Sequence, residues 1–364
     1  MKKIITFGEM MIRIAPLGFL RFRQALPGTA DLTFAGAEAN VAVSVANLGG
    51  DARFITALPK NDIAEAGIAT LRRFNVDVNS IVRTDQGRLG IYFVETGANQ
   101  RPSNVVYDRE GSSIACTSSS AYDWDLLLNG GDWFHTTGIT PSLSRQAAES
   151  TLEAVKAAKR KGLKVSCDLN FRKKLWKWDS SLDARSLAKK TMVEILPYVD
   201  VLIANESDCA DVLGIHAENT DTENGKLDIA RYPEVAQKVA RQFPNLEKVA
   251  ITLRESISAS HNNWGGMIYD AKTEKAFFAP LNEKGEYEPY PIRAIVDRVG
   301  GGDAFGAGLI FALTSEKYSS ASDAIRFAVA SSCLAHSIYG DFNFTSCSEV
   351  ENLMKGNASG RVQR

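Results

Sequence analysis

The sequence predicts an α/β protein in which a mainly parallel sheet carries helices on both faces, with a small additional β-sheet. Short apolar runs with the composition of strands alternate with helical patterns along most of the chain, and polar residues follow directly after several of these runs. Alternation of this kind favours a parallel sheet. The chain has 364 residues, 45% hydrophobic and 23% charged, which is typical of globular proteins. We expect a single domain over residues 1–354 and a flexible tail over residues 355–364.

The predicted elements follow one another in a regular order. Strands are expected over residues 3–7, 52–57, 132–135, 163–168, 199–204 and 248–253. Helices are expected over residues 39–48, 63–74, 143–161, 183–196, 206–213, 232–242, 304–314 and 322–337. Ligands of such folds bind beyond the carboxyl ends of the strands. Polar residues cluster there after three strands, over 168–172, 205–208 and 252–255.

Two segments depart from this alternation, residues 12–35 and 85–112. The first contains Pro16 and Pro27, and the second contains two β-type runs, 90–95 and 104–107, around a polar turn. We expect them to form a small β lid that closes over a ligand, although a hairpin without a role in binding fits the same pattern. The polar stretch 217–226 is predicted to be a surface loop.

Composition excludes several classes of protein. The formal net charge is −1, so no basic excess indicates a nucleic acid or an anionic membrane as partner. Five scattered cysteines without a C-x-x-C pair argue against a disulfide framework or a structural zinc site, and favour a reducing cytoplasm. Glu9 and Arg13 interrupt the N-terminal apolar run too early for a signal peptide, and no stretch approaches the length of a transmembrane helix.

The most informative motif spans residues 296–308. Three consecutive glycines, Gly300, Gly301 and Gly302, are followed by Asp303 and an apolar helical run. Glycines allow successive N–H groups to point into one concavity, and a helix N-terminus adds a positive partial charge, so the motif suits an anion. An aspartate at the mouth of such a site is placed to take a proton from a hydroxyl that attacks the anion. A plain tight turn is the alternative interpretation of this motif by itself.

Together with residues 35–49, this motif resembles the two signatures of the ribokinase-like (PfkB) carbohydrate kinases. Further segments, namely 8–13, 36–40, 90–93, 106–109, 137–141, 167–172 and 340–341, are similar to one branch of that family, the 2-keto-3-deoxygluconate kinases. The resemblance implies a ribokinase-like three-layer αβα core with a small β-sheet lid. It also implies ATP-dependent phosphorylation of 2-keto-3-deoxygluconate to 2-keto-3-deoxy-6-phosphogluconate.

The same resemblance assigns the catalytic residues. Asp303 matches the family's general base, and Gly300, Gly301 and Gly302 match its anion hole. Gly301 stands where the family usually has alanine. We expect this change to keep the N–H donor and to loosen the loop slightly.

The resemblance also assigns residues to the sugar. The implied substrate-binding residues are Gly36, Ala37, Glu38, Asn40, Tyr92, Tyr107, Arg109, Arg172 and Asp341. An arginine fork at Arg109 suits the carboxylate of a keto acid, although a solvated charge fits this residue taken alone. Asn40 could instead cap a helix. Arg13 lies where many family members have an aspartate, which suits an acidic substrate, but it could also be a surface charge.

The nucleotide is expected at the other strand ends. The implied residues are Asn170, Asn205, Thr252, Arg254, Gly300 and Gly302, and Asp208 is expected to organise Mg²⁺ through water. Aspartate at 208 replaces the usual glutamate, and the usual glycine near Arg254 is absent. Arg172 could contact either a phosphate or the carboxylate. ATP and Mg²⁺ are the implied cofactors; the sequence leaves open a monovalent cation, and a homo-oligomer formed through the lid.

Other functions are compatible with parts of the pattern. A kinase of the same family could act on fructose, ribose or a different sugar acid, and a sensor could keep the fold without catalysis. A dinucleotide-dependent dehydrogenase is disfavoured because Gly8-Glu9 stands where the G-x-G-x-x-G turn would open.

Overall fold

The computed structural model describes residues 2–205, 207–216 and 229–357. The strands are β1 Lys3–Phe7, β2 Met11–Ala15, β3 Asp31–Ala35, β4 Asp51–Ile55, β5 Ala57–Pro59, β6 Val82–Thr84, β7 Gly90–Glu95, β8 Asn104–Asp108, β9 Trp133–Thr137, β10 Lys164–Asp168, β11 Val201–Ala204, β12 Lys248–Ser258, β13 His261–Asp270, β14 Lys275–Ala279 and β15 Tyr290–Ile292. The helices are α1 Phe22–Ala25, α2 Ala37–Asn47, α3 Asp62–Arg73, α4 Ser113–Cys116, α5 Trp124–Leu127, α6 Ile139–Ser142, α7 Arg145–Arg160, α8 Ala184–Ile195, α9 Tyr232–Gln242, α10 Gly301–Thr314, α11 Ala321–Ala335 and α12 Cys347–Met354. A π-helical segment, η3, spans Cys209–Leu213, and three 3₁₀ turns are short.

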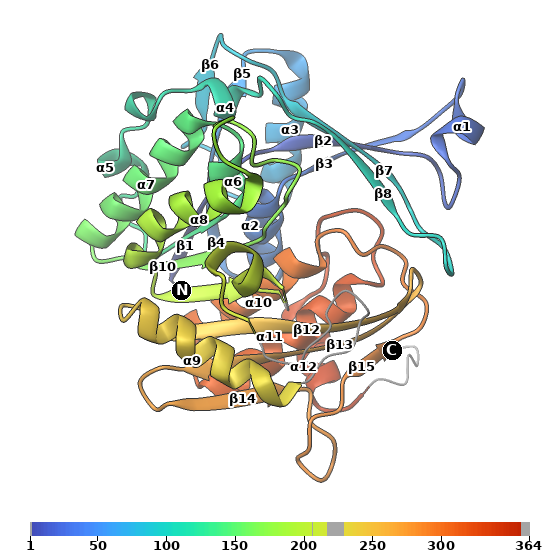
Figure 1. Ribbon diagram of the computed structural model, residues 1–364. Helices are drawn as coiled ribbons and strands as arrows, with labels where there is room; N and C mark the ends of the chain where they lie inside the picture. Colours follow the sequence, from blue (N-terminus) through green and yellow to red (C-terminus); the bar gives the residue numbers. More distant parts are fainter. Residues whose placement is uncertain (1, 206, 217–228, 358–364) are drawn as a thin grey trace.

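A nine-stranded sheet forms the centre of the molecule (Figure 1). Its order is β14-β13-β12-β11-β10-β9-β1-β4, with β15 paired to β13. The six neighbouring strands β12, β11, β10, β9, β1 and β4 pair in parallel. The strands β13, β14 and β15 complete the sheet with antiparallel pairing. The sheet is therefore mainly parallel, as the sequence predicts.

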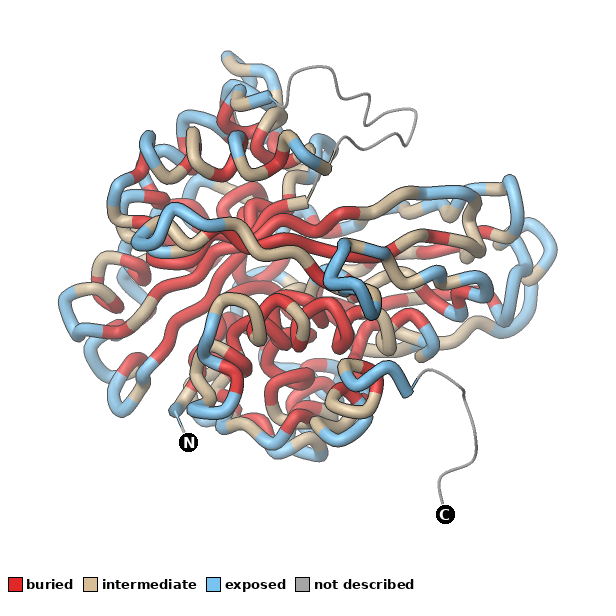
Figure 2. Tube along the Cα trace, turned by 90° about the horizontal axis from the view of Figure 1, so that it is seen from below, coloured by how far each residue is buried: buried red, intermediate tan, exposed pale blue. Residues whose placement is uncertain are grey.

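Helices cover both faces of this sheet because successive side chains of a strand point to opposite sides. Ile4 packs in a core with α2, α3, α10, α11 and α12, whereas its neighbour Ile5 packs in a second core with α7, α8 and α9. Figure 2 shows burial concentrated along the central strands, while the helices expose one face. The result is a three-layer αβα core.

A four-stranded sheet, the small sheet, projects from this core (Figure 1). Its order is β3-β2-β7-β8, and β2 and β7 pair in parallel, which joins two segments far apart in the sequence. Its strands come from the two segments in which the sequence predicts a second sheet. Met11, Ala35, Tyr92 and Val94 form a small core of their own there.

Most predicted elements occur within one or two residues of their expected bounds, with four differences. Where a helix is expected over residues 206–213, the described residues form the π-helical segment η3, Cys209–Leu213. β12 continues to Ser258, because the polar residues after Leu253 keep pairing with β13, so Thr252 and Arg254 lie within a strand and not beyond its end. Several elements have no counterpart among the predicted strands and helices; they are β6, β13, β14, β15, α1, α4, α5, α6 and α12. Helix α10 starts at Gly301, three residues earlier than expected.

Two predictions fall partly or wholly outside the described residues. The loop 217–226 lies entirely outside them, and of the predicted tail only residues 355–357 are described. Among the described residues, none of the helices is long and apolar enough to cross a membrane.

Candidate active site

A cavity of about 320 Å³ opens where β10 and β11 end, where α10 begins, and where the small sheet meets the core. Its position agrees with the rule for ligand sites in doubly wound sheets. Every site residue expected from the sequence lines this one cavity, except Glu38. They are Gly36, Ala37, Asn40, Tyr92, Tyr107, Arg109, Asn170, Arg172, Asn205, Asp208, Thr252, Arg254, Gly300, Gly301, Gly302, Asp303 and Asp341.

The first turn of α10 presents its backbone to this cavity. Gly300 caps the helix in the left-handed region, with φ +82°, and a Cβ there would lie 2.3 Å from the carbonyl oxygen of Asp341. Both facts restrict this position to glycine. The N–H groups at the start of the helix, including those of Gly302 and Asp303, have no partner within the helix, so they and the helix dipole can bind an anion.

Asp303 lies at the same helix start with its carboxylate held by Asn40. Asn40 Nδ2 donates to Asp303 Oδ2 at 2.6 Å. Burial raises the pKa of Asp303 to about 6; the Asn40 hydrogen bond opposes the shift, and the carboxylate of Asp341 adds to it. A carboxylate of this pKa is ionised near pH 7 and is more basic than an ordinary aspartate, which suits a general base.

The space beside Gly301 is occupied by a histidine ring. A Cβ at this position would lie 2.9 Å from Cε1 of His336, so the histidine ring fills the space that an alanine methyl group would need. His336 Nδ1 lies 2.7 Å from the carbonyl oxygen of Ser332, which requires Nδ1 to carry the proton. Burial lowers the pKa of His336 to about 4, so the ring is neutral.

Arg109 is buried, and its guanidinium group is already paired with an acid. Its side chain is 4% exposed, and both Nε and a terminal nitrogen lie 2.6 Å from Glu9 Oε2. The guanidinium also lies 5.6 Å from the centroid of the Tyr107 ring. The alternative of a solvated charge is therefore wrong, and Glu9 and Tyr107 fix the direction of the fork at the cavity wall.

Asn40 lies inside α2 rather than at its cap, which is Gly36. The helix-cap interpretation is therefore wrong, although Asn40 Oδ1 does accept from the Gly36 N–H at 3.3 Å. A Cβ at Gly36 would lie 2.0 Å from the carbonyl oxygen of Glu9, and its φ is +150°. Glycine is thus required where the turn from β3 into α2 passes the connection between β1 and β2.

Glu38 does not line the cavity. Its side chain is buried, and Oε1 accepts from the Thr137 N–H at 3.0 Å and from the hydroxyls of Thr137 and Thr140 at 2.7 and 2.9 Å. Burial raises its pKa to about 7. The expected substrate contact is corrected to a structural one, because this carboxylate ties α2 to the end of β9 and to α6.

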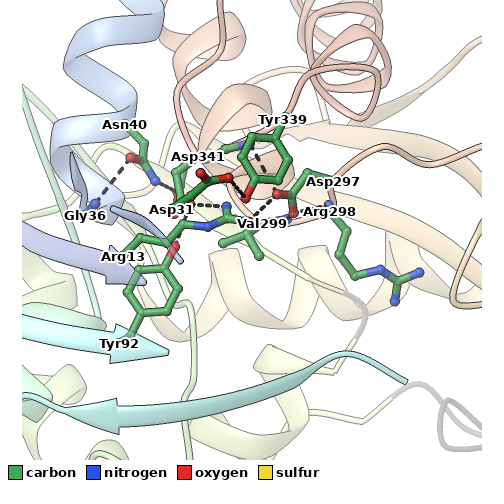
Figure 3. Close-up of polar contacts among 12 residues, drawn as sticks. Arg13, Asp31, Gly36, Asn40, Tyr92, Asp297, Arg298, Val299, Tyr339 and Asp341 are labelled. Atoms are coloured by element: carbon green, nitrogen blue, oxygen red, sulfur yellow. Dashed lines mark hydrogen bonds and ion pairs between the residues drawn. The ribbon is translucent and has the colours of Figure 1, made fainter. Parts of the chain in front are cut away.

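Arg13 is neither a surface charge nor a cavity residue. It is 1% exposed, its NH1 donates to Asp341 Oδ1 at 2.7 Å, and its NH2 donates to Asp297 Oδ2 at 2.5 Å (Figure 3). Tyr92 donates its hydroxyl to the same oxygen of Asp341 at 2.5 Å. Burial by itself would lower the pKa of Arg13, but Asp341, Tyr92 and Asp297 raise it overall, so the guanidinium is charged.

The opposite side of the cavity is built by the loops after β10 and β11. Asn170 has a left-handed backbone, φ +38°, which is uncommon outside glycine and often marks a functional position. Asp208 accepts from the Phe171 N–H at 3.1 Å and from the Asn205 N–H at 2.9 Å, so it holds the two loops together. Arg172 is exposed at the cavity.

The sequence assigned no specific role to several cavity residues, although Asp168 is among the polar residues expected at the strand ends. Those lining the cavity include Asp168, Asn262, Trp264, Arg298 and His336. Asp168 ends a predicted strand, so its position was a usable signal. Asn262 and Trp264 lie on the unpredicted β13, and nothing in the sequence pairs Glu9 with Arg109.

The residues present fit a nucleotide with Mg²⁺ held mainly by phosphate and water. Asp168 and Asp208 are acids at the cavity; burial, with the nearby charges of Asp208 and Asp303, raises the pKa of Asp168 well above its ordinary value. Neighbouring carboxylates of this kind suit a divalent cation. Among the described residues, however, no group of three or more His, Cys, Asp or Glu side chains could hold a metal by itself.

Known proteins resemble this chain over nearly its whole length. The family model described as pfkB family carbohydrate kinase matches residues 1–253. The 2-dehydro-3-deoxygalactonokinase of Haloferax volcanii is 30% identical over 98% of each chain, and the 2-dehydro-3-deoxygluconokinase of Thermoproteus tenax is 27% identical over 98% of this chain and 95% of its own. A solved structure of 2-dehydro-3-deoxygluconokinase from Thermotoga maritima has 41% identity and a TM-score of 0.87, covering 98% of this chain and all of that one.

Proposed function

Since the chain belongs to the pfkB family of carbohydrate kinases, we propose that it transfers the γ-phosphoryl group of ATP to the terminal hydroxyl of 2-keto-3-deoxygluconate. The product is 2-keto-3-deoxy-6-phosphogluconate. The observation that carries this proposal is the presence in one cavity of Asp303, the start of α10 and the buried fork of Arg109. The names 2-keto-3-deoxy and 2-dehydro-3-deoxy describe the same sugar acid.

Asp303 would accept the proton of the terminal hydroxyl as its oxygen attacks the γ-phosphorus. A positioned base contributes about a hundred- to ten-thousand-fold. Its raised pKa and the Asn40 hydrogen bond support this role, since they give an oriented carboxylate that is both ionised and basic. The N–H groups at the start of α10, including those of Gly302 and Asp303, would bond the oxygens of the transferring phosphoryl group.

Arg109 supports an acidic acceptor. A buried guanidinium group held by Glu9 and lying over the Tyr107 ring is oriented before the ligand arrives, so it loses little freedom on binding a carboxylate. The two relatives and the solved structure described above, all named as kinases of 2-dehydro-3-deoxy sugar acids, support the same class. We infer that the small sheet acts as a lid, because it brings Tyr92, Tyr107 and Arg109 to the cavity and covers the acceptor.

The nucleotide would lie along the loops after β10 and β11, against Asn170, Asn205 and Thr252, with Arg172 and Arg254 near its phosphates. Asp208 and Asp168 would reach Mg²⁺ through water. Mg²⁺ supplies neutralisation of phosphate charge when it is bound. The chain's own contribution is to hold the donor, the acceptor and the Asp303 carboxylate in line.

A substrate panel with ATP and Mg²⁺ tests the proposal. ADP release is measured with 2-keto-3-deoxygluconate, its C4 epimer 2-keto-3-deoxygalactonate, fructose and ribose. A charge-assisted hydrogen bond contributes about 1.5–3 kcal/mol, so kcat/KM for the sugar acid is expected to exceed that for fructose by at least about tenfold. Equal values for the acid and fructose would overturn the acidic acceptor, and tight binding without turnover would favour a sensor.

The epimer is the second candidate acceptor. The 30%-identical relative is named for the galactonate form, whereas the 41%-identical structure is named for the gluconate form. The two acids share the carboxylate, the keto group and the terminal hydroxyl, and differ in one hydroxyl configuration at C4. A higher kcat/KM for the galactonate form would move the assignment to that acid without changing the proposed mechanism.

A further inference from the structure

Arg13 is the largest fully buried side chain among the described residues, and it lies on β2 of the small sheet. It does not line the cavity, yet both of its carboxylate partners belong to segments that shape the cavity. Figure 3 shows the guanidinium group between Asp297 and Asp341. Its separate nitrogens bond the two acids, at 2.5 and 2.7 Å.

Asp297 organises the loop that leads into α10. Its Oδ1 accepts from the N–H groups of Arg298 and Val299 at 2.8 and 3.1 Å, and its Oδ2 accepts from Arg13 and from the Gly340 N–H at 3.2 Å. Both oxygens are therefore fully used. The guanidinium group neutralises a buried carboxylate that fixes the backbone directly before Gly300.

Residues 339–341 join three strands of the small sheet to the same loop. Tyr339 donates to Asp31 of β3 at 3.0 Å, while Asp341 accepts from Arg13 of β2 and Tyr92 of β7. The carbonyl oxygen of Asp341 also lies so close to Gly300 that a Cβ there would be 2.3 Å away. A displacement of Asp341 would thus reach both the acceptor side of the cavity and the start of α10.

We propose that Arg13 is a positioning residue for phosphoryl transfer, which holds the small sheet in register with the start of α10 by bridging Asp297 and Asp341. The proposal rests on the proposed phosphoryl transfer but not on which carbohydrate is the acceptor. A lysine at this position would keep the positive charge but would offer one nitrogen in place of two nitrogens in a fixed plane. It could not bond both acids with the arginine geometry.

The test compares Arg13→Lys with Arg53→Lys as a matched control. Arg53 also pairs with an aspartate, Asp77, at 2.9 Å and bonds two backbone carbonyl oxygens, but it does not line the cavity or touch its loops. On whichever acceptor the wild-type protein phosphorylates, we expect Arg13→Lys to lower kcat at least tenfold with KM for ATP within threefold. We expect Arg53→Lys to leave both constants within twofold.

Two further measurements separate positioning from loss of folding. Hydrogen–deuterium exchange in the free protein is expected to accelerate at the amides of Arg298, Val299 and Gly340 in Arg13→Lys and not in Arg53→Lys. Asp297→Asn is expected to lower kcat in the wild-type background. In the Arg13→Lys background it is expected to lower kcat by less than a further threefold, because both changes break the same bridge. Arg13→Met is measured in parallel. It removes both the charge and the bridge, whereas Arg13→Lys removes the bridge and keeps the charge.

A folded Arg13→Lys with kcat within twofold of wild type would overturn the proposal, and so would fully additive effects of Arg13→Lys and Asp297→Asn. Failure of the acceptor assignment is distinguishable, since it would appear in the wild-type substrate panel while the Arg13 comparison is run on the acceptor that works. If no acceptor works at all, the exchange measurement still decides: unchanged exchange at those three amides would overturn the bridge.

Discussion

Alanine substitutions at Gly300, Gly301 and Gly302 are predicted to change the free energy of unfolding in different directions, because the three glycines have different surroundings. At Gly300 the backbone is left-handed, which costs an L-residue about 1–2 kcal/mol. The added methyl group would also lie 2.3 Å from a backbone oxygen, and overpacking of this kind costs about 1–3 kcal/mol. Gly300→Ala is therefore expected to lower the free energy of unfolding by about 2–5 kcal/mol.

Gly302 is the control within the same turn. Apart from its chain neighbours and the backbone of its own helix, a Cβ there has no heavy atom within 4 Å among the described residues, and the residue is helical, so alanine is expected to stabilise the free protein by about 0.5–1 kcal/mol. Gly301→Ala is expected to change stability by less than about 1 kcal/mol, since the helical gain is offset by moving the His336 ring, whose Cε1 would be 2.9 Å away. Thermal or urea unfolding of the three variants measures this order.

Activity should not follow stability in this series. The Gly302 methyl group would enter the cavity where the phosphoryl oxygens are expected and would keep an oxygen away from the N–H donors, although the N–H of residue 302 itself remains. A donor that the oxygen no longer reaches costs about 3 kcal/mol, or roughly a hundredfold in kcat. The combination of a more stable protein with a much slower enzyme is therefore the signature of an anion site. Wild-type kcat in Gly302→Ala, or a Gly300→Ala variant as stable as Gly302→Ala, would refute the reasoning.

Three further predictions concern charge. kcat/KM should fall as the pH drops through about 6, because Asp303 becomes protonated there. Asn40→Ala should move this fall in kcat/KM to higher pH, because the hydrogen bond that opposes the rise in the Asp303 pKa is lost. A flat pH–rate profile down to pH 5 would contradict both expectations. The folded state holds the Asp303 proton more tightly than the unfolded state, so the stability from this group is present below pH 3.8 and is lost as the pH rises through about 6. Asp303→Asn should consequently unfold at a higher temperature than wild type at pH 8, and an equal or lower temperature would argue against burial as the cause of the shift. Arg109→Lys should raise KM for the sugar acid at least tenfold, since a bidentate fork is lost. The matched control Arg88→Lys, which changes an exposed ion pair with Asp108, should leave this KM unchanged. Similar KM values in both variants would show that Arg109 does not bind the carboxylate.

The fold could be predicted where apolar periodicity is strong and failed where it is interrupted. β1 and α9 have the predicted bounds because a mostly apolar run and a clear helical repeat define them. β13 contains Asn262, Asn263, Gly265 and Gly266, residue types that are depleted in strands, and only its pairing with β12 and β14 makes it one. That information lies in tertiary contacts and not in the local sequence.

The candidate site could be predicted to the extent that motifs carry it. The glycines and Asp303 follow from local chain geometry, and residues assigned by resemblance meet at one cavity although they come from distant segments. Glu38 was placed wrongly because a signature shows which residues recur and not which way a side chain points. Arg13 was left between two interpretations, since its partners Asp297 and Asp341 lie about 300 residues away and only the fold brings them together.

The Asp303→Asn variant tests the central claim most directly. The substitution keeps the size of the side chain and removes the base, so kcat on the best acceptor is predicted to fall by a factor of about 10² to 10⁴. Calorimetric dissociation constants for ATP and for the acceptor are predicted to stay within about threefold of wild type. Turnover within tenfold of wild type, with the variant folded and both ligands bound, would contradict the assignment of Asp303 as the base and with it the proposed mechanism.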